Sequence, residues 1–177
     1  MQAPIVCLEC RRVPPPLEWT DSWGHYQGSL EAVLLALKFR GHDFLAELLS
    51  DHLLERLIER PDVRFDALVP VPLHRTRLRR RGFNQAELLA RGLEKRTAIP
   101  VRRMLRKVRD NEAQSMLPRR AREANVHRAF KASPLAEGLS LLVVDDVCTT
   151  GATLRSCARS LLDAGAERVC AVTVARA

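Results

Sequence analysis

The sequence of 177 residues has no long hydrophobic run. No stretch approaches the roughly 20 uncharged apolar residues that a membrane-spanning helix requires, and the first residues lack the basic region that opens a signal peptide. From these two absences we expect a cytoplasmic protein. Hydrophobic residues still make up 46% of the chain, which is enough to bury the core of one compact domain.

The number of cysteines is odd. Five cysteines in a chain without an export signal argue against a disulfide framework. Cys7 and Cys10 form a CxxC pair, whereas the other three, Cys148, Cys157 and Cys170, are scattered far downstream. The first 28 residues also hold a run of prolines and both tryptophans. We therefore predict a small appendage over residues 1–28 and a main domain over residues 29–177.

Charge is unevenly distributed along the chain. The formal net charge is +8, but residues 74–130 hold 17 Lys and Arg against 5 Asp and Glu, a net of +12 that leaves −4 for the remainder. A positive centre suits an anionic partner such as a phosphate, a pyrophosphate or a nucleic-acid backbone, since each accepts the paired hydrogen bonds of arginine. The alternative is a solvated arginine-rich surface.

Hydrophobic spacing in the first two thirds predicts helices and strands in turn. Apolar residues recur at helical spacing on both sides of Gly41, which predicts two amphipathic helices that end before Pro61. Residues 67–71 are a short apolar run that favours a buried strand, residues 84–96 have the apolar face of a helix, and a further strand begins at residue 100. Residues 102–128 are highly charged, so we expect a long flexible loop there, ending in a strand near residues 126–131.

The last third has the clearest pattern. Residues 139–144 predict a strand, residues 152–164 a helix ended by Gly165, and residues 168–174 another strand. A strand, a helix and a strand in this length are typical of a βαβ unit with a parallel crossover. The fold class predicted from the sequence is therefore α/β.

Two adjacent carboxylates, Asp145 and Asp146, follow the first of these strands and open a loop that we expect over residues 145–153. In open α/β sheets, ligands bind at the carboxyl ends of the strands. Carboxylates there can accept hydrogen bonds from vicinal ribose hydroxyls. The turn from Cys148 to Thr153 has small or hydroxylated side chains, so backbone N–H groups at the helix start can close around a phosphate. The segment thus predicts a site for a phosphorylated ribose.

The two carboxylates have two other interpretations. An apolar strand that ends in aspartates also occurs in nucleotide-hydrolysing motors, but the chain has no G-x-x-x-x-G-K-[ST] segment to hold the phosphates. Asp145 and Asp146 could instead be simple loop and capping residues. Adjacent carboxylates at a buried edge would then repel each other, unless hydroxyls or a cation offset the charge.

The segment VVDDVCTTGAT, at residues 143–153, resembles the signature of type I phosphoribosyltransferases that binds phosphoribosyl pyrophosphate (PRPP). Further motifs make the whole chain resemble the ComF (competence protein F) family of that superfamily: Tyr26-x-Gly28, Leu37-Lys38-Phe39, Val69-Pro70-Val71-Pro72-Leu73, Arg81-Gly82-Phe83-Asn84-Gln85, Gln114, Arg122-x-x-Asn125 and Phe130. The resemblance implies an open parallel sheet flanked by helices, with a short cysteine-containing appendage at the N-terminus.

The resemblance also implies roles for individual residues. Asp145 and Asp146 would hold the ribose hydroxyls, together with a Mg²⁺ ion bound largely through substrate oxygens. The 5′-phosphate would bind at Thr149, Thr150, Gly151, Ala152 and Thr153. The pyrophosphate would bind at Pro72, Leu73, His74 and Arg75, with Arg81 facing a phosphate. The flexible loop over residues 102–128 would close over PRPP, and its Arg109 is a candidate catalytic residue.

Some of these residues also have a structural explanation. Asn84 is a plausible N-cap for the helix that follows it, and for Asn84 and Gln85 a role in capping and packing competes evenly with a ligand contact. A single histidine such as His74 is more often structural than in contact with substrate.

The CxxC pair departs from the family pattern. The family commonly has a zinc ribbon with two CxxC pairs, because a closed structural zinc site needs four ligands. Here Cys7 and Cys10 supply one pair, His25 is a candidate third ligand, and a fourth ligand has no candidate. Zn²⁺ would bind only if the missing ligands were supplied. Either the chain begins too late or the zinc site has been lost, and we favour the first.

Two functions fit the resemblance. The first is a phosphoribosyltransferase that moves ribose 5-phosphate from PRPP to an acceptor, linked to DNA uptake or nucleotide metabolism; any hood that grips the acceptor must come from residues 1–60. The alternative is a non-catalytic PRPP- or nucleotide-sensing adaptor that binds single-stranded DNA or a helicase partner. Grooves that bind single strands add stacking aromatics, and only Phe83 and Phe130 lie in the basic region.

Overall fold

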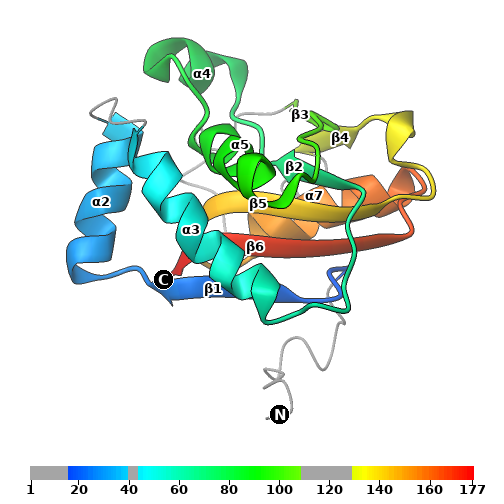
Figure 1. Ribbon diagram of the computed structural model, residues 1–177. Helices are drawn as coiled ribbons and strands as arrows, with labels where there is room; N and C mark the ends of the chain where they lie inside the picture. The colour runs from blue at the N-terminus through cyan, green and yellow to red at the C-terminus, as the bar shows by residue number, and fades with distance from the viewer. Residues whose placement is uncertain (1–15, 40–43, 109–128) are drawn as a thin grey trace.

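The computed structural model describes residues 16–39, 44–108 and 129–177. Within these residues, four parallel strands form a central sheet in the order β1-β6-β5-β2. The strands are β1 (Thr20–His25), β2 (Ala67–Pro70), β5 (Ser140–Cys148) and β6 (Arg168–Arg176). The expected α/β class with an open parallel sheet is thereby confirmed (Figure 1).

Helices cover both faces of this sheet (Figure 1). One face packs against α2 (Gly28–Phe39), α3 (Phe44–Ile58) and α5 (Gln85–Thr97). The other face packs against α7 (Ala152–Asp163) and a small antiparallel pair made of β3 (Leu105–Lys107) and β4 (Phe130–Ala132). The remaining elements are the helix α4 (Arg75–Arg81) and the short 3-10 helix η2 (Pro134–Ala136).

The sequence of β5 explains why the sheet is covered on both sides. Leu141 and Val143 belong to the core on the α7 side, whereas Leu142 and Val144 belong to the core on the α3 and α5 side. All four side chains are fully buried, and each contributes about 1.5–3 kcal/mol through removal of apolar surface from water. An unbroken apolar run is what a parallel strand needs when helices cover both of its faces.

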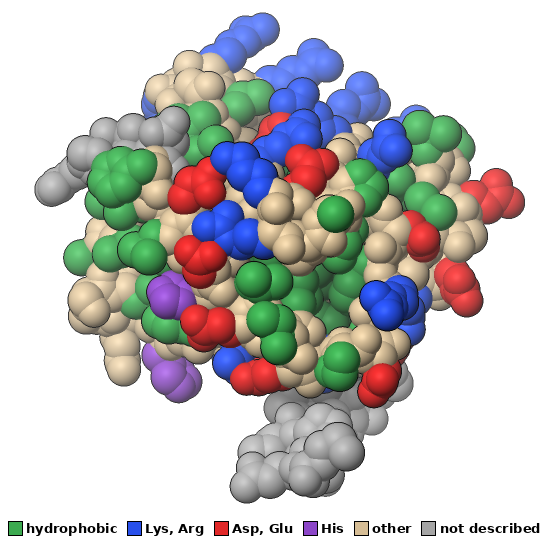
Figure 2. Space-filling view, in the orientation of Figure 1, with side chains coloured by type: hydrophobic (Ala, Val, Ile, Leu, Met, Phe, Trp, Pro, Cys, Tyr) green, Lys and Arg blue, Asp and Glu red, His purple; other side chains and the backbone are tan. Residues whose placement is uncertain are grey.

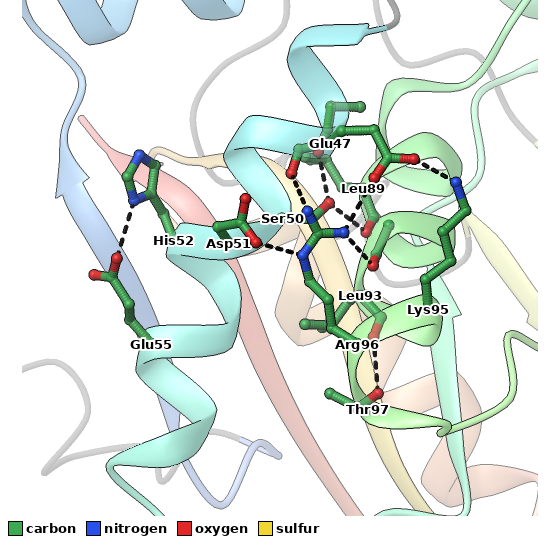
Figure 3. A network of polar contacts seen from close by, with 12 residues as sticks. Glu47, Ser50, Asp51, His52, Glu55, Leu89, Leu93, Lys95, Arg96 and Thr97 are labelled. Atoms are coloured by element: carbon green, nitrogen blue, oxygen red, sulfur yellow. Dashed lines mark hydrogen bonds and ion pairs between the residues drawn. The ribbon is translucent and has the colours of Figure 1, made fainter.

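A close contact between α3 and α5 fixes the position of α5 on the sheet. Gly92 allows it, because a side chain there would place its Cβ 2.2 Å from the Ser50 Oγ. At the rim of the contact, Arg96 from α5 donates to Asp51 at 2.5 Å and to Glu47 at 3.1 Å. Lys95 also pairs with Glu47 (Figure 3). We refer to these residues together as the α3–α5 clamp.

Several expected elements are confirmed and others need correction. The helices on either side of Gly41, the strand after residue 66, the helix after residue 84 and the C-terminal βαβ unit are all present. The strand expected from residue 100 is only a single bridge, between Val101 and Leu68. The strand expected near residues 126–131 is β4, which lies at Phe130–Ala132. Most of the flexible loop expected over residues 102–128 lies outside the described residues.

Two corrections concern the ends of the main sheet. The expected loop at residues 145–153 is wrong in its first part, because β5 continues to Cys148 and is held by β6, so that both aspartates lie within a strand. In the segment assigned to the appendage, β1 pairs in parallel with β6 and forms one edge of the sheet. Cys7 and Cys10 lie outside the described residues, and the zinc-ribbon-like character of the segment stays a prediction. No described helix has the length and hydropathy to cross a membrane.

Candidate ligand site at the carboxyl end of β5

The candidate site forms where β5 runs past its neighbour β2. β2 pairs with β5 only from Leu141 to Val144, and the Val71 N–H makes a last hydrogen bond to the Val144 carbonyl at 3.0 Å. Beyond that point β5 keeps β6 on one side but no longer has β2 on the other. This is the edge of a parallel sheet at which α/β proteins bind ligands.

The Asp146 carboxylate points to the side of the sheet that α2 and α5 cover. Its side chain is 6% exposed, and its Oδ2 lies 2.5 Å from the Lys38 Nζ at the end of α2. Its Oδ1 accepts a longer hydrogen bond of 3.4 Å from the Gln85 side chain in the first turn of α5. Two helices distant in sequence therefore position this carboxylate.

Asp145 has a different environment although it is the next residue. Side chains alternate along a strand, so Asp145 faces the α7 side, and its charge helps burial to raise the pKa of Cys157 on that helix. Its Oδ1 accepts a hydrogen bond from the Asp146 N–H at 2.9 Å. Burial, followed by repulsion from the Asp146 carboxylate, raises the pKa of Asp145 well above its usual value, and the Lys38 charge opposes this only in part. The ionised form of Asp145 is therefore disfavoured relative to an exposed aspartate.

Arg81 extends the same set of contacts outward. Its Nη1 donates to the Gln85 Oε1 at 2.6 Å, and its guanidinium group lies 5.4 Å from the centre of the Phe39 ring. Burial lowers the pKa of Arg81, while the Asp146 charge acts in the opposite direction. A chain of polar contacts therefore joins a partly exposed arginine to the buried carboxylate.

The turn after β5 has the form expected for an anion site. Thr149 and Thr150 are exposed, and Gly151 caps α7 with a φ of 72° and no capping side chain. The Ala152 N–H makes a long 3.4 Å hydrogen bond to the Thr150 Oγ1, and Arg155 donates to the Thr150 carbonyl at 2.8 Å. Backbone N–H groups of the first helical turn attract anions.

Cys148, which directly precedes this turn, is a buried thiol. Burial raises its pKa, and a raised pKa disfavours the thiolate that a nucleophile requires. The groups of the turn that could bind a ligand are therefore its hydroxyl and backbone N–H groups.

The segment proposed to hold pyrophosphate is divided between two environments. Pro72 and Leu73 line a groove of about 520 Å³ between α4, α5 and β3, with Phe83 among its other walls. His74 caps α4 and its Nδ1 lies 2.9 Å from the Thr76 Oγ1, and Arg75 is the exposed first residue of that helix. Figure 2 shows Lys and Arg side chains gathered at the top of this face, over α4 and α5.

The residues predicted from the sequence are thus only partly brought together. Asp145, Asp146 and the turn residues 149–153 lie along the end of β5 and the start of α7, and Arg81 is linked to Asp146 through Gln85. Asn84 is confirmed as the N-cap of α5, since its side chain accepts from the Ala86 N–H at 3.2 Å. Arg109, Cys7 and Cys10 lie outside the described residues.

Lys38 was not predicted as a site residue, although its contact with Asp146 is the shortest in the site. The signal was available, since Lys38 belongs to the Leu37-Lys38-Phe39 motif. Among the described residues, no group of three or more His, Cys, Asp or Glu side chains could hold a metal ion by itself.

Comparison with known proteins agrees with this geometry. Residues 49–177 match the family model of the phosphoribosyl transferase domain. The chain is 34% identical over 170 residues to the DNA utilization protein YhgH of Salmonella typhi, across 93% of this chain and 75% of that protein. It is 36% identical over 141 residues to the competence protein ComFC of Bacillus subtilis, where the match covers 79% of this chain and 56% of the relative.

A solved structure shows the same fold. The glutamine phosphoribosylpyrophosphate amidotransferase from Bacillus subtilis, complexed with ADP and GMP, superposes with a TM-score of 0.51 at 24% identity. The match covers 73% of this chain but only 26% of that enzyme, so it establishes the fold alone. With the domain match and the extended similarity to its relatives, the chain belongs to the phosphoribosyl transferase family, in the branch of the competence and DNA utilization proteins.

Proposed function

We propose that the protein binds PRPP at the carboxyl end of β5, with the ribose at the two aspartates and the 5′-phosphate at the start of α7. The observation that carries the proposal is the position of Asp145 and Asp146 at the end of β5, one short turn before the glycine-capped start of α7. The carboxylate of Asp146 can accept a hydrogen bond from a ribose hydroxyl. The exposed hydroxyls of Thr149 and Thr150 and the first N–H groups of α7 suit a phosphate.

Mg²⁺ fits this arrangement as a partner of the ligand. Mg²⁺ commonly uses one or two carboxylates and completes its shell with water and substrate phosphate oxygens. Asp145 and Asp146 would supply that small number of oxygens. When bound, the ion would offset the charge of the pyrophosphate. The two aspartates would hold both the ion and the sugar.

The reaction that we propose is transfer of ribose 5-phosphate from PRPP to an acceptor, with pyrophosphate as the leaving group. Membership of the phosphoribosyl transferase family supports it. The names of the relatives, which refer to DNA utilization and competence, support a role in the handling of DNA or its nucleotides. That the protein acts in the cytoplasm stays a prediction.

Thermal denaturation with and without PRPP and Mg²⁺ tests the proposal. The wild type should gain stability from the ligand, by about 2.7 kcal/mol at a ligand concentration of 100 times Kd. The double variant Asp145→Asn with Asp146→Asn should show no ligand-induced shift. Asp163→Asn is the matched control, because Asp163 is exposed at the far end of α7. A wild type whose melting temperature is unchanged by PRPP and Mg²⁺ would overturn the proposal.

A further inference from the structure

Lys38 and Asp146 form a largely buried ion pair at the centre of the proposed site. The Lys38 side chain is 20% exposed and the Asp146 side chain is 6% exposed, with 2.5 Å between the Lys38 Nζ and the Asp146 Oδ2. The ammonium group also lies 6.0 Å from the centre of the Tyr26 ring. This environment keeps the ammonium in place at the end of α2.

A buried ion pair of this kind is a weak source of stability. Removing two charges from water costs several kcal/mol per ion, and the attraction between them often no more than offsets that cost. The position of the pair, at the open end of β5, therefore points to a role in binding rather than in folding. An ammonium group has three N–H donors, and one contact to Asp146 leaves capacity for an anion that approaches from the open edge.

The two faces of the sheet separate the two ends of the proposed ligand. The glycine-capped start of α7, which suits the 5′-phosphate, lies on the face to which Asp145 points. Lys38, Gln85 and Arg81 lie on the opposite face, with Asp146. A ribose held across the carboxyl end of β5 with its 5′-phosphate at α7 would present the group on its C1 atom toward this second set of side chains.

We propose that Lys38 is a binding residue for the anionic group on C1 of the ribose, its ammonium group paired with Asp146 while donating an N–H to a pyrophosphate oxygen. The inference rests on the proposed PRPP site and adds a residue to it. It makes the end of α2 the part of the molecule that distinguishes PRPP from sugar phosphates without a charged group on C1. Lys38 would bind the pyrophosphate without taking part in bond cleavage.

Binding of two ligands separates this role from a structural one. Isothermal titration with PRPP and with ribose 5-phosphate, both with Mg²⁺, gives the ratio of the two Kd values. Lys38→Met should raise the Kd of PRPP about tenfold to a hundredfold, which is the usual effect of losing a hydrogen bond to a charged group. The Kd of ribose 5-phosphate should change by less than about twofold. Lys38→Arg keeps the charge and should recover part of the discrimination.

Controls make each result decisive. Lys95→Met removes an exposed lysine of α5 and should leave both Kd values unchanged. Lys38→Gln keeps a donor toward Asp146 and replaces Lys38→Met if that variant does not fold. An equal rise in the Kd values of both ligands, or no rise in either, would overturn the inference without contradicting the proposed PRPP site. Failure of the wild type to bind PRPP would instead overturn the proposed function.

Discussion

The α3–α5 clamp and the carboxyl end of β5 both contain close pairs of opposite charges, but their carboxyl groups differ in environment. In the clamp, hydrogen bonds from Lys95 and Arg96 lower the pKa of Glu47, and a hydrogen bond from Arg96 lowers that of Asp51. At the end of β5, burial raises the pKa of Asp145.

This difference follows from exposure to solvent. The Lys95 and Glu47 side chains are 67% and 49% exposed, so water solvates and screens their charges. Asp145 and Asp146 occupy the end of a strand whose preceding residues are fully buried, where two adjacent carboxylates are costly. A fold retains such a cost where a ligand offsets it. The contrast agrees with a packing role for the clamp and supports the proposed binding role for the end of β5.

Gly92→Ala should have the largest effect on folding. Its Cβ would lie 2.2 Å from the Ser50 Oγ and 2.8 Å from the Ser50 Cβ, so that no side-chain rotation removes the clash. We expect a loss of about 1–3 kcal/mol in the free energy of unfolding, measured by urea denaturation. In a Ser50→Gly background the same change should cost much less, because the clashing atoms are gone. An equal loss in both backgrounds would contradict the role of this contact in the clamp.

Gly151→Ala should have a smaller effect on folding and a clear one on the ligand. Gly151 has a φ of 72°, a conformation that costs a residue with a side chain about 1 kcal/mol, and its Cβ would lie 3.2 Å from the Arg155 Nη1. We expect a stability loss of about that size by urea denaturation, together with weaker binding of PRPP and of ribose 5-phosphate alike. Weaker binding of PRPP alone, with binding of ribose 5-phosphate unchanged, would show that this turn does not hold the 5′-phosphate.

The sequence predicted the elements whose hydrophobic pattern is local. The apolar run of residues 141–144 predicts a strand covered on both faces, and Asn84 predicts the start of α5 because a capping side chain bonds within its own turn. The turn after Cys148 was recognised for the same reason. Each of these signals lies within a few residues of the element that it indicates.

The features that the sequence did not predict either lack a local hydrophobic pattern or depend on distant partners. α4 is rich in arginine and buries none of its residues, so no apolar periodicity marks it. β1 owes its place to pairing with β6 from the other end of the chain. The contact between Lys38 and Asp146, and the placement of the adjacent aspartates on opposite faces, follow from the extension of β5 past β2. A local pattern does not contain this information.

Asp145→Asn should stabilise the ligand-free protein and abolish PRPP binding. A raised pKa means that the folded protein binds a proton at Asp145 that the unfolded chain has released, so the wild type loses stability as the pH rises above about 4. Asparagine does not ionise, so the variant should be more stable than the wild type at pH 7. The difference, expected to stay below about 1 kcal/mol because Asp145 is partly exposed, should shrink toward pH 4. Thermal denaturation across this pH range checks the sign, and a variant less stable at pH 7 would contradict it.

Lys95→Ala in the clamp should have the smallest effect and offers the sharpest contrast with Lys38. Both lysines pair with a carboxylate, but solvent and salt screen the exposed pair with Glu47. We expect Lys95→Ala to cost about 0.3 kcal/mol in urea denaturation at low salt and nothing measurable at 1 M salt. Lys38→Ala would leave the Asp146 carboxylate buried without its partner, so its cost should be several times larger and should persist in salt. If both variants lost stability equally and salt removed both effects, the two ion pairs would be equivalent, and the distinction between clamp and site would fail.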